Sequence, residues 1–104
     1  FKFNAAHFVA FEGYRERLHG HNYSVAARLV GKLNGDGYVI DFGDVKKMLR
    51  AICKELNEYF LCPCLSNVLD IGSAEDGKQL TIRCADGSFF SIPQTDCAML
   101  PIVH

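Results

Sequence analysis

Apolar and polar side chains alternate along two N-terminal stretches, with the two-residue period of a β-strand. The first stretch covers residues 1–11, and the second, longer one covers residues 18–30. Residues 12–17 between them are polar and include a glycine, as is usual for a connecting loop. We therefore predict two strands that a hairpin connection could bring side by side.

A helical period replaces this alternation after a glycine-rich turn at residues 31–37, which ends the second strand. Residues 38–40 predict a short extended piece, and Asp41 then stands where a helix N-cap is expected. An amphipathic helix laid on a sheet should follow, running to about Tyr59 and kept from going much further by Pro63. Its apolar stripe consists of Val45, Leu49, Ile52 and Leu56.

One hairpin is the clearest signal in the rest of the chain. Two strand-like runs, residues 79–84 and 88–92, flank an Asp-Gly turn signal at Asp86. No repeat or linker divides the sequence, so we predict a single small domain over residues 1–104. The less regular segments are 66–71, which is short and mixed, 72–77, which predicts a loop, and 95–104, which is irregular.

Composition and charge narrow the class of protein. The 104 residues are 49% hydrophobic with a formal net charge of −1, as in an ordinary globular domain. Lys and Arg are scattered among Asp and Glu, which excludes a broad basic surface for nucleic acid or an anionic membrane but leaves a small anion possible. No apolar run approaches the ~20 residues of a membrane span, and no secretory signal is seen. We expect a cytoplasmic protein.

The cysteines argue against a disulfide framework, because they are five in number and irregularly spaced. Cys62 and Cys64 are separated by a single residue, which is shorter than the usual zinc-ligand spacing, and no second pair matches them. We interpret all five as reduced, partly buried thiols. They are Cys53, Cys62, Cys64, Cys84 and Cys97.

Three histidines are spaced to hold a metal ion. His19 and His21 are two residues apart at the start of the second strand, so their side chains share a face. His7 lies in the first strand, where hairpin pairing would bring it alongside. Three imidazoles suit an open zinc site, which leaves one position for water or substrate. A lone histidine is more often a satisfied or exposed imidazole, and His104 keeps that interpretation.

A base would complete such a site. An open zinc site polarises a substrate hydroxyl or carbonyl, which makes an adjacent C–H acidic. Glu16, three residues before His19, could remove that proton, although a solvated loop carboxylate is an equally good interpretation of the sequence alone. Glu12 is a weaker rival because it lies further from the histidine pair.

Four motifs up to about residue 60 together resemble the family of 6-pyruvoyl-tetrahydropterin and 6-carboxy-tetrahydropterin synthases. They are Phe3-Asn4-Ala5-Ala6-His7, His19-Gly20-His21-Asn22-Tyr23, Gly35-Asp36-Gly37 and Asp41-Phe42-Gly43-Asp44-Val45-Lys46. The resemblance implies an α+β T-fold, with helices on one face of an antiparallel sheet, and a hexamer with active sites between subunits. It also implies a lyase that uses Zn²⁺, bound by His7, His19 and His21, to act on 7,8-dihydroneopterin triphosphate in pterin and folate biosynthesis.

One departure from the family concerns the base. Most members carry a cysteine four residues before the first histidine of His-Gly-His, where this chain has Arg15. The segment from Tyr14 to His19 instead resembles the apicomplexan branch, in which a glutamate three residues before that histidine replaces the cysteine. The resemblance thus assigns the base to Glu16 and favours 6-hydroxymethyl-dihydropterin as product, with the pyruvoyl and carboxy products as runners-up.

A second departure concerns proton transfer. Family members usually carry an Asp-His pair near the helix end, where this chain has Asn57 and Glu58. Asn57 cannot titrate, so Glu58 is the remaining candidate, unless the reaction runs differently or has been lost. The tail from Cys97 to His104 resembles the apicomplexan branch just before its second helix. The resemblance therefore implies that the C-terminal part of the domain, with a pterin-anchoring glutamate, lies outside this sequence.

Three functions are compatible with these observations. The leading one is the zinc-dependent pterin lyase, with Glu16 and Glu58 as catalytic residues and a small pterin triphosphate as its partner. The alternative is a catalytically impaired relative, a zinc-containing pterin-binding or oligomerisation module, which Asn57 and Glu58 would suit. A generic zinc hydrolase is less favoured, because the family match extends through the helix cap at Asp41.

Overall fold

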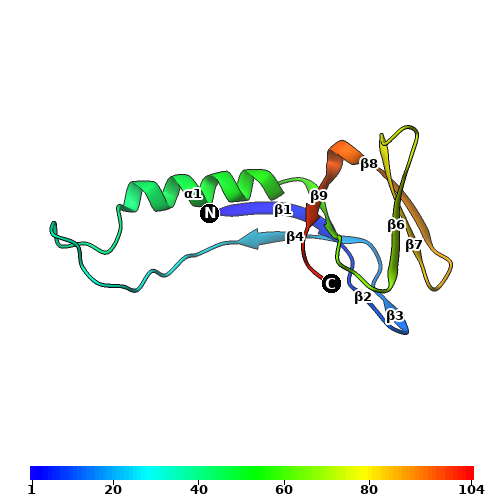
Figure 1. The fold of residues 1–104 in the computed structure, drawn as a ribbon, viewed down its shortest axis with the longest axis horizontal. Coiled ribbons are helices and arrows are strands. Elements are labelled where there is room, and N and C mark those ends of the chain that lie inside the picture. The colour runs from blue at the N-terminus through cyan, green and yellow to red at the C-terminus, as the bar shows by residue number, and fades with distance from the viewer.

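A computed structural model describes residues 1–104 as one α-helix and nine strands in three sheets (Figure 1). The strands are β1 (Lys2–His7), β2 (Ala10–Phe11), β3 (Tyr14–Arg15), β4 (His19–Ser24), β5 (Tyr59–Pro63), β6 (Leu69–Ala74), β7 (Gln79–Cys84), β8 (Phe89–Pro93) and β9 (Cys97–Leu100). The helix α1 spans Phe42–Leu56, and a 3-10 helix, Gln94–Asp96, precedes β9. The sheets have the strand orders β4-β1-β5-β9, β2-β3 and β6-β7-β8.

The predicted α+β class is confirmed, with α1 packed against β1 and β5. β1 and β4 pair antiparallel, as expected for a hairpin connection, and their register sets Phe3 opposite Tyr23 and His7 opposite His19. β5 joins parallel to β1, and β9 joins parallel to β5, so the four-stranded sheet is mixed. These parallel pairs join segments far apart in sequence, which local alternation does not reveal.

The helix begins where predicted and ends slightly earlier. A carboxylate oxygen of Asp41 accepts hydrogen bonds from the backbone N–H groups of Gly43 (2.7 Å) and Asp44 (3.4 Å), which caps the first turn. α1 ends at Leu56 rather than at about Tyr59, because Tyr59 already belongs to β5. The two residues between the helix and this strand are those at which the sequence departs from the expected Asp-His pair.

The packed face of α1 differs by one position from the predicted stripe. Ile52 is 50% exposed, and its neighbour Cys53 is buried instead. The assignment of Ile52 was wrong, because only the narrow stripe that touches β1 and β5 is covered. The covered positions are Val45, Lys46, Leu49, Cys53 and Leu56. At 15 residues, and with charged side chains along it, α1 is too short and too polar to cross a membrane.

The second predicted strand is shorter in the structure. β4 ends at Ser24 rather than at Val30, and residues 38–40 form no strand. The last backbone hydrogen bond between this segment and the β1 end of the sheet runs from the N–H of Val25 to the carbonyl of Phe1 (2.7 Å). Residues 25–30 pair with no strand in this structure, so alternation alone does not hold the segment in a sheet.

The C-terminal hairpin is confirmed as β7 and β8, which turn at Gly87 with a positive φ of 88° that glycine adopts without strain. Two segments were assigned wrongly from sequence. Residues 72–74 belong to β6 instead of a loop, and residues 97–100 form β9 instead of an irregular tail. Both are strands because a partner is available, β7 in the first case and β5 in the second.

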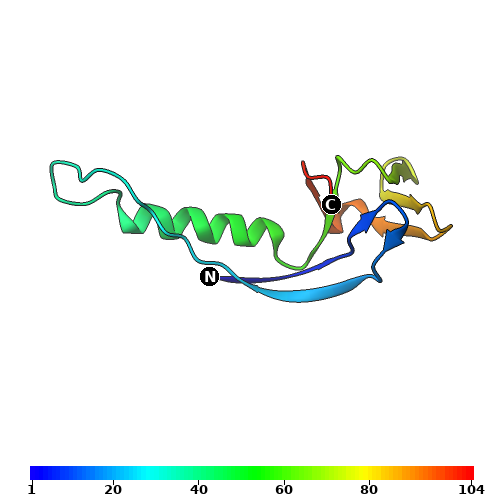
Figure 2. The same cartoon turned by 90° about the horizontal axis from the view of Figure 1, so that it is seen from below.

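Buried side chains gather at one end of an elongated molecule. The radius of gyration is 17.7 Å, against about 13 Å for a compact chain of this length. Figures 1 and 2 show α1 and the loop before it extending away from the β6–β8 sheet. One core lies where this sheet meets the end of the larger one, so the segment after β1 is anchored there. It consists of Phe8, Ala10, Phe60, Cys62, Leu69, Leu80, Ile82 and Cys84.

Candidate functional site

Three imidazoles meet on the neighbouring strands β1 and β4. The register sets His7 opposite His19 and Ala5 opposite His21, so the three rings lie on one face of the sheet. The ring centroids are 4.8 Å apart for His7 and His19, 5.0 Å for His7 and His21, and 4.8 Å for His19 and His21. One potential ligand nitrogen of each ring lies within 4.8 Å of the other two. The structure thus brings together the histidines that the sequence singles out.

The hydrogen bonds of these rings leave nitrogens free to bind a metal. Nδ1 of His19 lies 2.6 Å from the backbone carbonyl oxygen of Arg17. A carbonyl oxygen only accepts, so Nδ1 carries the proton and Nε2 keeps its lone pair. Nε2 of His7 is buried and has no hydrogen-bond partner. An unsatisfied buried nitrogen is costly, and a cation held by the cluster would satisfy it.

The surroundings of His7 favour its neutral form by lowering its pKa. Burial lowers its pKa, and positive charge on His19 and on His21 lowers it further. The negative charge of Glu16 raises the pKa of His7 and so opposes these effects. A neutral imidazole is the form that a metal requires. The influence of Glu16 on His7 also shows that its carboxylate lies within electrostatic reach of the cluster.

The loop after β1 holds Glu16 by both its backbone and its side chain. Its carboxylate Oε1 accepts a hydrogen bond from the N–H of Val9 (2.8 Å), and its own N–H donates to the carbonyl of Val9 (2.9 Å). Val9 stands between two core residues, Phe8 and Ala10. The Glu16 carboxylate is therefore hydrogen-bonded to a backbone segment that is anchored in the hydrophobic core. Sequence reasoning missed Val9, because a backbone group leaves no signal in the side chains.

Glu12, the weaker candidate, lies elsewhere. It occupies the turn between β2 and β3, beside Gly13, and is exposed. It lines a cavity of about 730 Å³ between this hairpin and the β7–β8 turn, and none of the three clustered histidines lines that cavity. This placement separates Glu12 from the histidine cluster, whereas the charge of Glu16 acts on His7.

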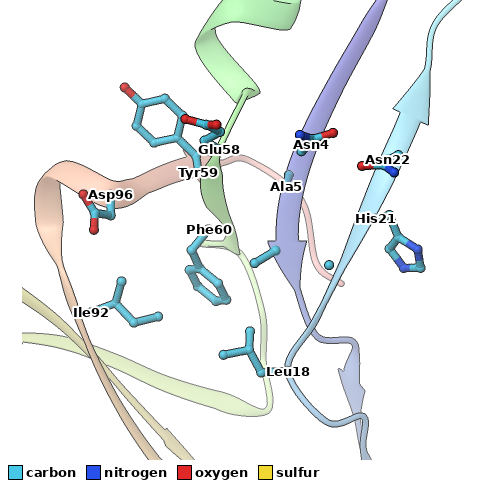
Figure 3. Close-up of a pocket in the computed structure, with 12 residues that line it drawn as sticks. Asn4, Ala5, Leu18, His21, Asn22, Glu58, Tyr59, Phe60, Ile92 and Asp96 are labelled. Carbon is cyan, nitrogen blue, oxygen red and sulfur yellow. The ribbon is translucent and has the colours of Figure 1, made fainter.

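Glu58 also lies apart from the histidines. It connects α1 to β5 with a positive φ of 64°, and its N–H donates to the carbonyl of Asn4. It lines a pocket of about 540 Å³ together with Tyr59 and Asp96, and His21 lines the same pocket. Figure 3 shows the Glu58 carboxylate on the other side of β1 from His21, whose ring points away from it. Within this chain Glu58 therefore does not belong to the group of three potential metal ligands, although it shares a pocket with His21.

The donor set suits one cation with an open position. Three neutral imidazoles match the ligands of catalytic zinc sites, which keep the fourth position for water or substrate. Glu16 is the carboxylate whose charge acts on His7, and a base within reach of a metal-bound substrate can move its proton. Within a single chain, the arrangement is equipped for metal-assisted proton transfer.

Comparison with known proteins places the chain in one family. Residues 1–76 match the family described as 6-pyruvoyl tetrahydropterin synthase. A putative 6-carboxy-5,6,7,8-tetrahydropterin synthase of Methanocaldococcus jannaschii is 32% identical over 97% of this chain and 61% of that protein. A dihydroneopterin monophosphate aldolase of Pyrococcus furiosus is 38% identical over 62% of this chain and 55% of that protein.

A solved structure shows the same fold. The crystal structure of 6-pyruvoyl tetrahydropterin synthase from Plasmodium vivax is 48% identical, with a TM-score of 0.92, and covers 99% of this chain and 62% of that one. Two further structures of that enzyme, each with a glutamate described as its catalytic residue replaced by alanine or cysteine, match equally well. The chain spans about three-fifths of the length of these Methanocaldococcus and Plasmodium relatives. By the match over residues 1–76 and by its fold, this chain belongs to the 6-pyruvoyl tetrahydropterin synthase family.

Proposed function

We propose that this chain is a zinc-dependent lyase that acts on 7,8-dihydroneopterin triphosphate. The observation that carries the proposal is the cluster of three imidazoles, whose ligand nitrogens lie within 4.8 Å of one another. Glu16 supports it, because its negative charge acts on the pKa of His7. Membership of a family of pterin-pathway proteins supports the substrate class.

His7, His19 and His21 would hold the zinc ion. The unsatisfied Nε2 of His7 and the proton on Nδ1 of His19 both suit this role. When bound, zinc would act as a Lewis acid toward the side-chain hydroxyls of the pterin. The protein's own part is to orient three neutral rings on two paired strands, a rigid support for such a site.

Glu16 would accept a proton from the substrate side chain. Its attachment to Val9 sets the direction of the carboxylate, and the P. vivax enzyme also has a glutamate described as catalytic. We propose cleavage of the side chain to give 6-hydroxymethyl-dihydropterin, and the aldolase from P. furiosus supports such carbon–carbon chemistry within the group of relatives. The pyruvoyl and carboxy products remain the runners-up. Glu58 would contribute from the other side of β1, in the pocket that His21 also lines.

We propose a hexamer with sites between subunits as the working assembly. Large apolar side chains are exposed along α1 and the loop before it, including Leu33, Phe42 and Met48. Apolar surface of this extent is usually covered by other protein. The single-domain organisation and the cytoplasmic location stay predictions from the sequence.

A catalytically impaired module is the second candidate, and Asn57 favours it. The Asn57 side chain accepts a hydrogen bond from the N–H of Asn4 (2.9 Å), which ties the end of α1 to β1. Asn57 therefore has a structural contact here and no titratable group. Such a protein would keep metal and fold but lack turnover.

Incubating the full-length protein with 7,8-dihydroneopterin triphosphate tests the proposal. Mass spectrometry would identify the product, and metal analysis would measure zinc per chain. We expect one zinc per chain and formation of 6-hydroxymethyl-dihydropterin. Stoichiometric zinc without any new pterin would favour the impaired module, and absence of bound metal would contradict both candidates.

A further inference from the structure

Arg15 joins the loop that carries Glu16 to a hairpin more than seventy residues away in sequence. Its Nε donates to a carboxylate oxygen of Asp86 (3.0 Å), and its Nη2 donates to the hydroxyl of Ser88 (2.9 Å). Both partners belong to the turn between β7 and β8. The guanidinium thus uses its rigid fork of donors to bind this turn at two points.

Aromatic rings hold the guanidinium from the side. Phe8 and Phe90 stack with ring centroids 4.7 Å apart, and the guanidinium carbon of Arg15 lies 5.9 Å and 5.4 Å from their centroids. The Arg15 side chain is only 21% exposed. A cation that is packed on aromatic rings and hydrogen-bonded at its tip loses little further freedom when it binds a neighbour.

The acceptor at the turn is itself held in place. Asp86 accepts a hydrogen bond from the N–H of Ser88 (2.9 Å) through its second carboxylate oxygen. Hydrogen bonds from Ser88 and Arg15 lower the Asp86 pKa to about 2, so the carboxylate is charged throughout the neutral range. Asp86 is 48% exposed, which makes it the contact that can be changed with least disturbance of the core.

The third donor of Arg15 reaches the next residue. Nη1 donates to the backbone carbonyl of Glu16 (2.9 Å), while the N–H and the carboxylate of Glu16 both bind Val9. Residue 16 is therefore held on one side by the segment after β1 and on the other by the β7–β8 turn, acting through Arg15. The β6–β8 sheet has no other contact with the site among these hydrogen bonds.

We propose that Arg15, fixed by Asp86 and Ser88, is a positioning residue for the Glu16 carboxylate. The inference rests on the proposed function for its catalytic consequence, and on this chain's own contacts for the placement of residue 16. The β6–β8 sheet would then serve the reaction by holding Glu16, the proposed catalytic base, which lies in a loop distant in sequence. Arg15 itself would not touch the substrate.

The test uses hydrogen exchange and steady-state kinetics on the full-length protein. The variants are Asp86→Ala and Arg15→Gln, with Arg15→Lys as the conservative change and Arg83→Gln as the matched control. Arg83 lies in β7 over the ring of Phe89, at 4.9 Å, and its side chain makes no hydrogen bond or ion pair with the loop before His19. The exposed position of Asp86 keeps the experiment informative even where an Arg15 variant folds poorly.

We expect faster exchange of the Val9 and Glu16 amides in Asp86→Ala and Arg15→Gln, and unchanged exchange in Arg83→Gln. The value of kcat should fall about tenfold with KM and zinc content unchanged, because a displaced base weakens the chemical step and not ground-state binding. Arg15→Lys should recover part of kcat, since it keeps the charge but not the fork. The variant that combines Asp86→Ala with Arg15→Gln should lose no more kcat than the single variant with the larger loss, because both changes break the same contact.

Two results would overturn the inference. Unchanged exchange at Val9 and Glu16 would show that the contact does not restrain the loop. Faster exchange with unchanged kcat in an active enzyme would show that the restraint does not position the base. Absence of turnover in the unsubstituted protein would refute the proposed lyase instead, and the exchange data would still decide whether Arg15 holds residue 16.

Discussion

The two ends of this molecule differ in how far the chain buries its own apolar side chains. At one end the β6–β8 sheet closes over a core that includes Phe8 and Phe60, and the histidine cluster and Glu16 lie next to it. At the other end α1 and the loop before it carry apolar side chains that nothing in this chain covers. The candidate site therefore lies at the end of the molecule where the chain forms its own buried core. The extended part leaves apolar side chains such as Leu33 and Phe42 exposed.

The largest expected effect, on zinc binding and turnover, comes from changing a histidine of the cluster on β1 and β4. His19→Ala should abolish stoichiometric zinc binding and any turnover, because two imidazoles alone leave a catalytic zinc site incomplete. His104→Ala, at the far end of the chain, should keep both. Metal analysis and product formation measure the effect, and retention of one zinc per chain in His19→Ala would contradict the assigned ligands.

A change of the base should be nearly as large but should spare the metal. Glu16→Gln keeps the shape of the side chain and should lower kcat by about 10²–10⁴-fold, the usual contribution of a general base. Glu58→Gln should have a much smaller effect, since Glu58 lies across β1 from His21. Rates are compared at equal zinc occupancy. Equal losses in the two variants would show that the single-chain geometry does not decide the base.

Matched isoleucines compare the stability of the two ends directly. Ile82 is fully buried in the core, whereas Ile52 on α1 is 50% exposed. Ile82→Ala should lower the free energy of unfolding by about 2–5 kcal/mol through lost burial and a cavity. Ile52→Ala should change it by about 0.5 kcal/mol or less in the isolated chain. Chemical denaturation measures both, and a large effect at Ile52 would contradict its exposed position on α1.

The smallest expected effect concerns pH at the β7–β8 turn. The pKa of Asp86 is lowered from 3.8 to about 2, first by its hydrogen bonds from Ser88 and then by Arg15. A lowered carboxyl pKa means that the stabilising contribution is complete above about pH 4 and is lost as the pH falls through 2. Arg15→Gln should move the pKa only part of the way back, because the Ser88 contacts remain. Carbon-13 NMR titration of the carboxyl group would detect the shift, and an unchanged pKa would contradict the contact.

Local patterns predicted the elements whose signals lie within a few residues. The Asp41 cap, the body of α1 and the Asp-Gly hairpin all formed where expected, since capping and turn chemistry act over a single turn. The strand to Val30 was wrong, as were the loop assignment at residues 72–74 and the irregular assignment at residues 97–100, because a strand forms only where it has a partner. The partner of β9 is distant in sequence, whereas β6 pairs with the next strand, β7.

For the site, the sequence by itself determined which side chains are available: three histidines with strand spacing and a glutamate just before the second of them. The tertiary structure decided which of them meet. It set the three rings together through the β1–β4 register, bound Glu16 to Val9 and Arg15, and left Glu58 on the other side of β1. The sequence gives the chemistry of each side chain directly. The distances between side chains depend on strand pairing and burial, which bring together residues that no local pattern connects.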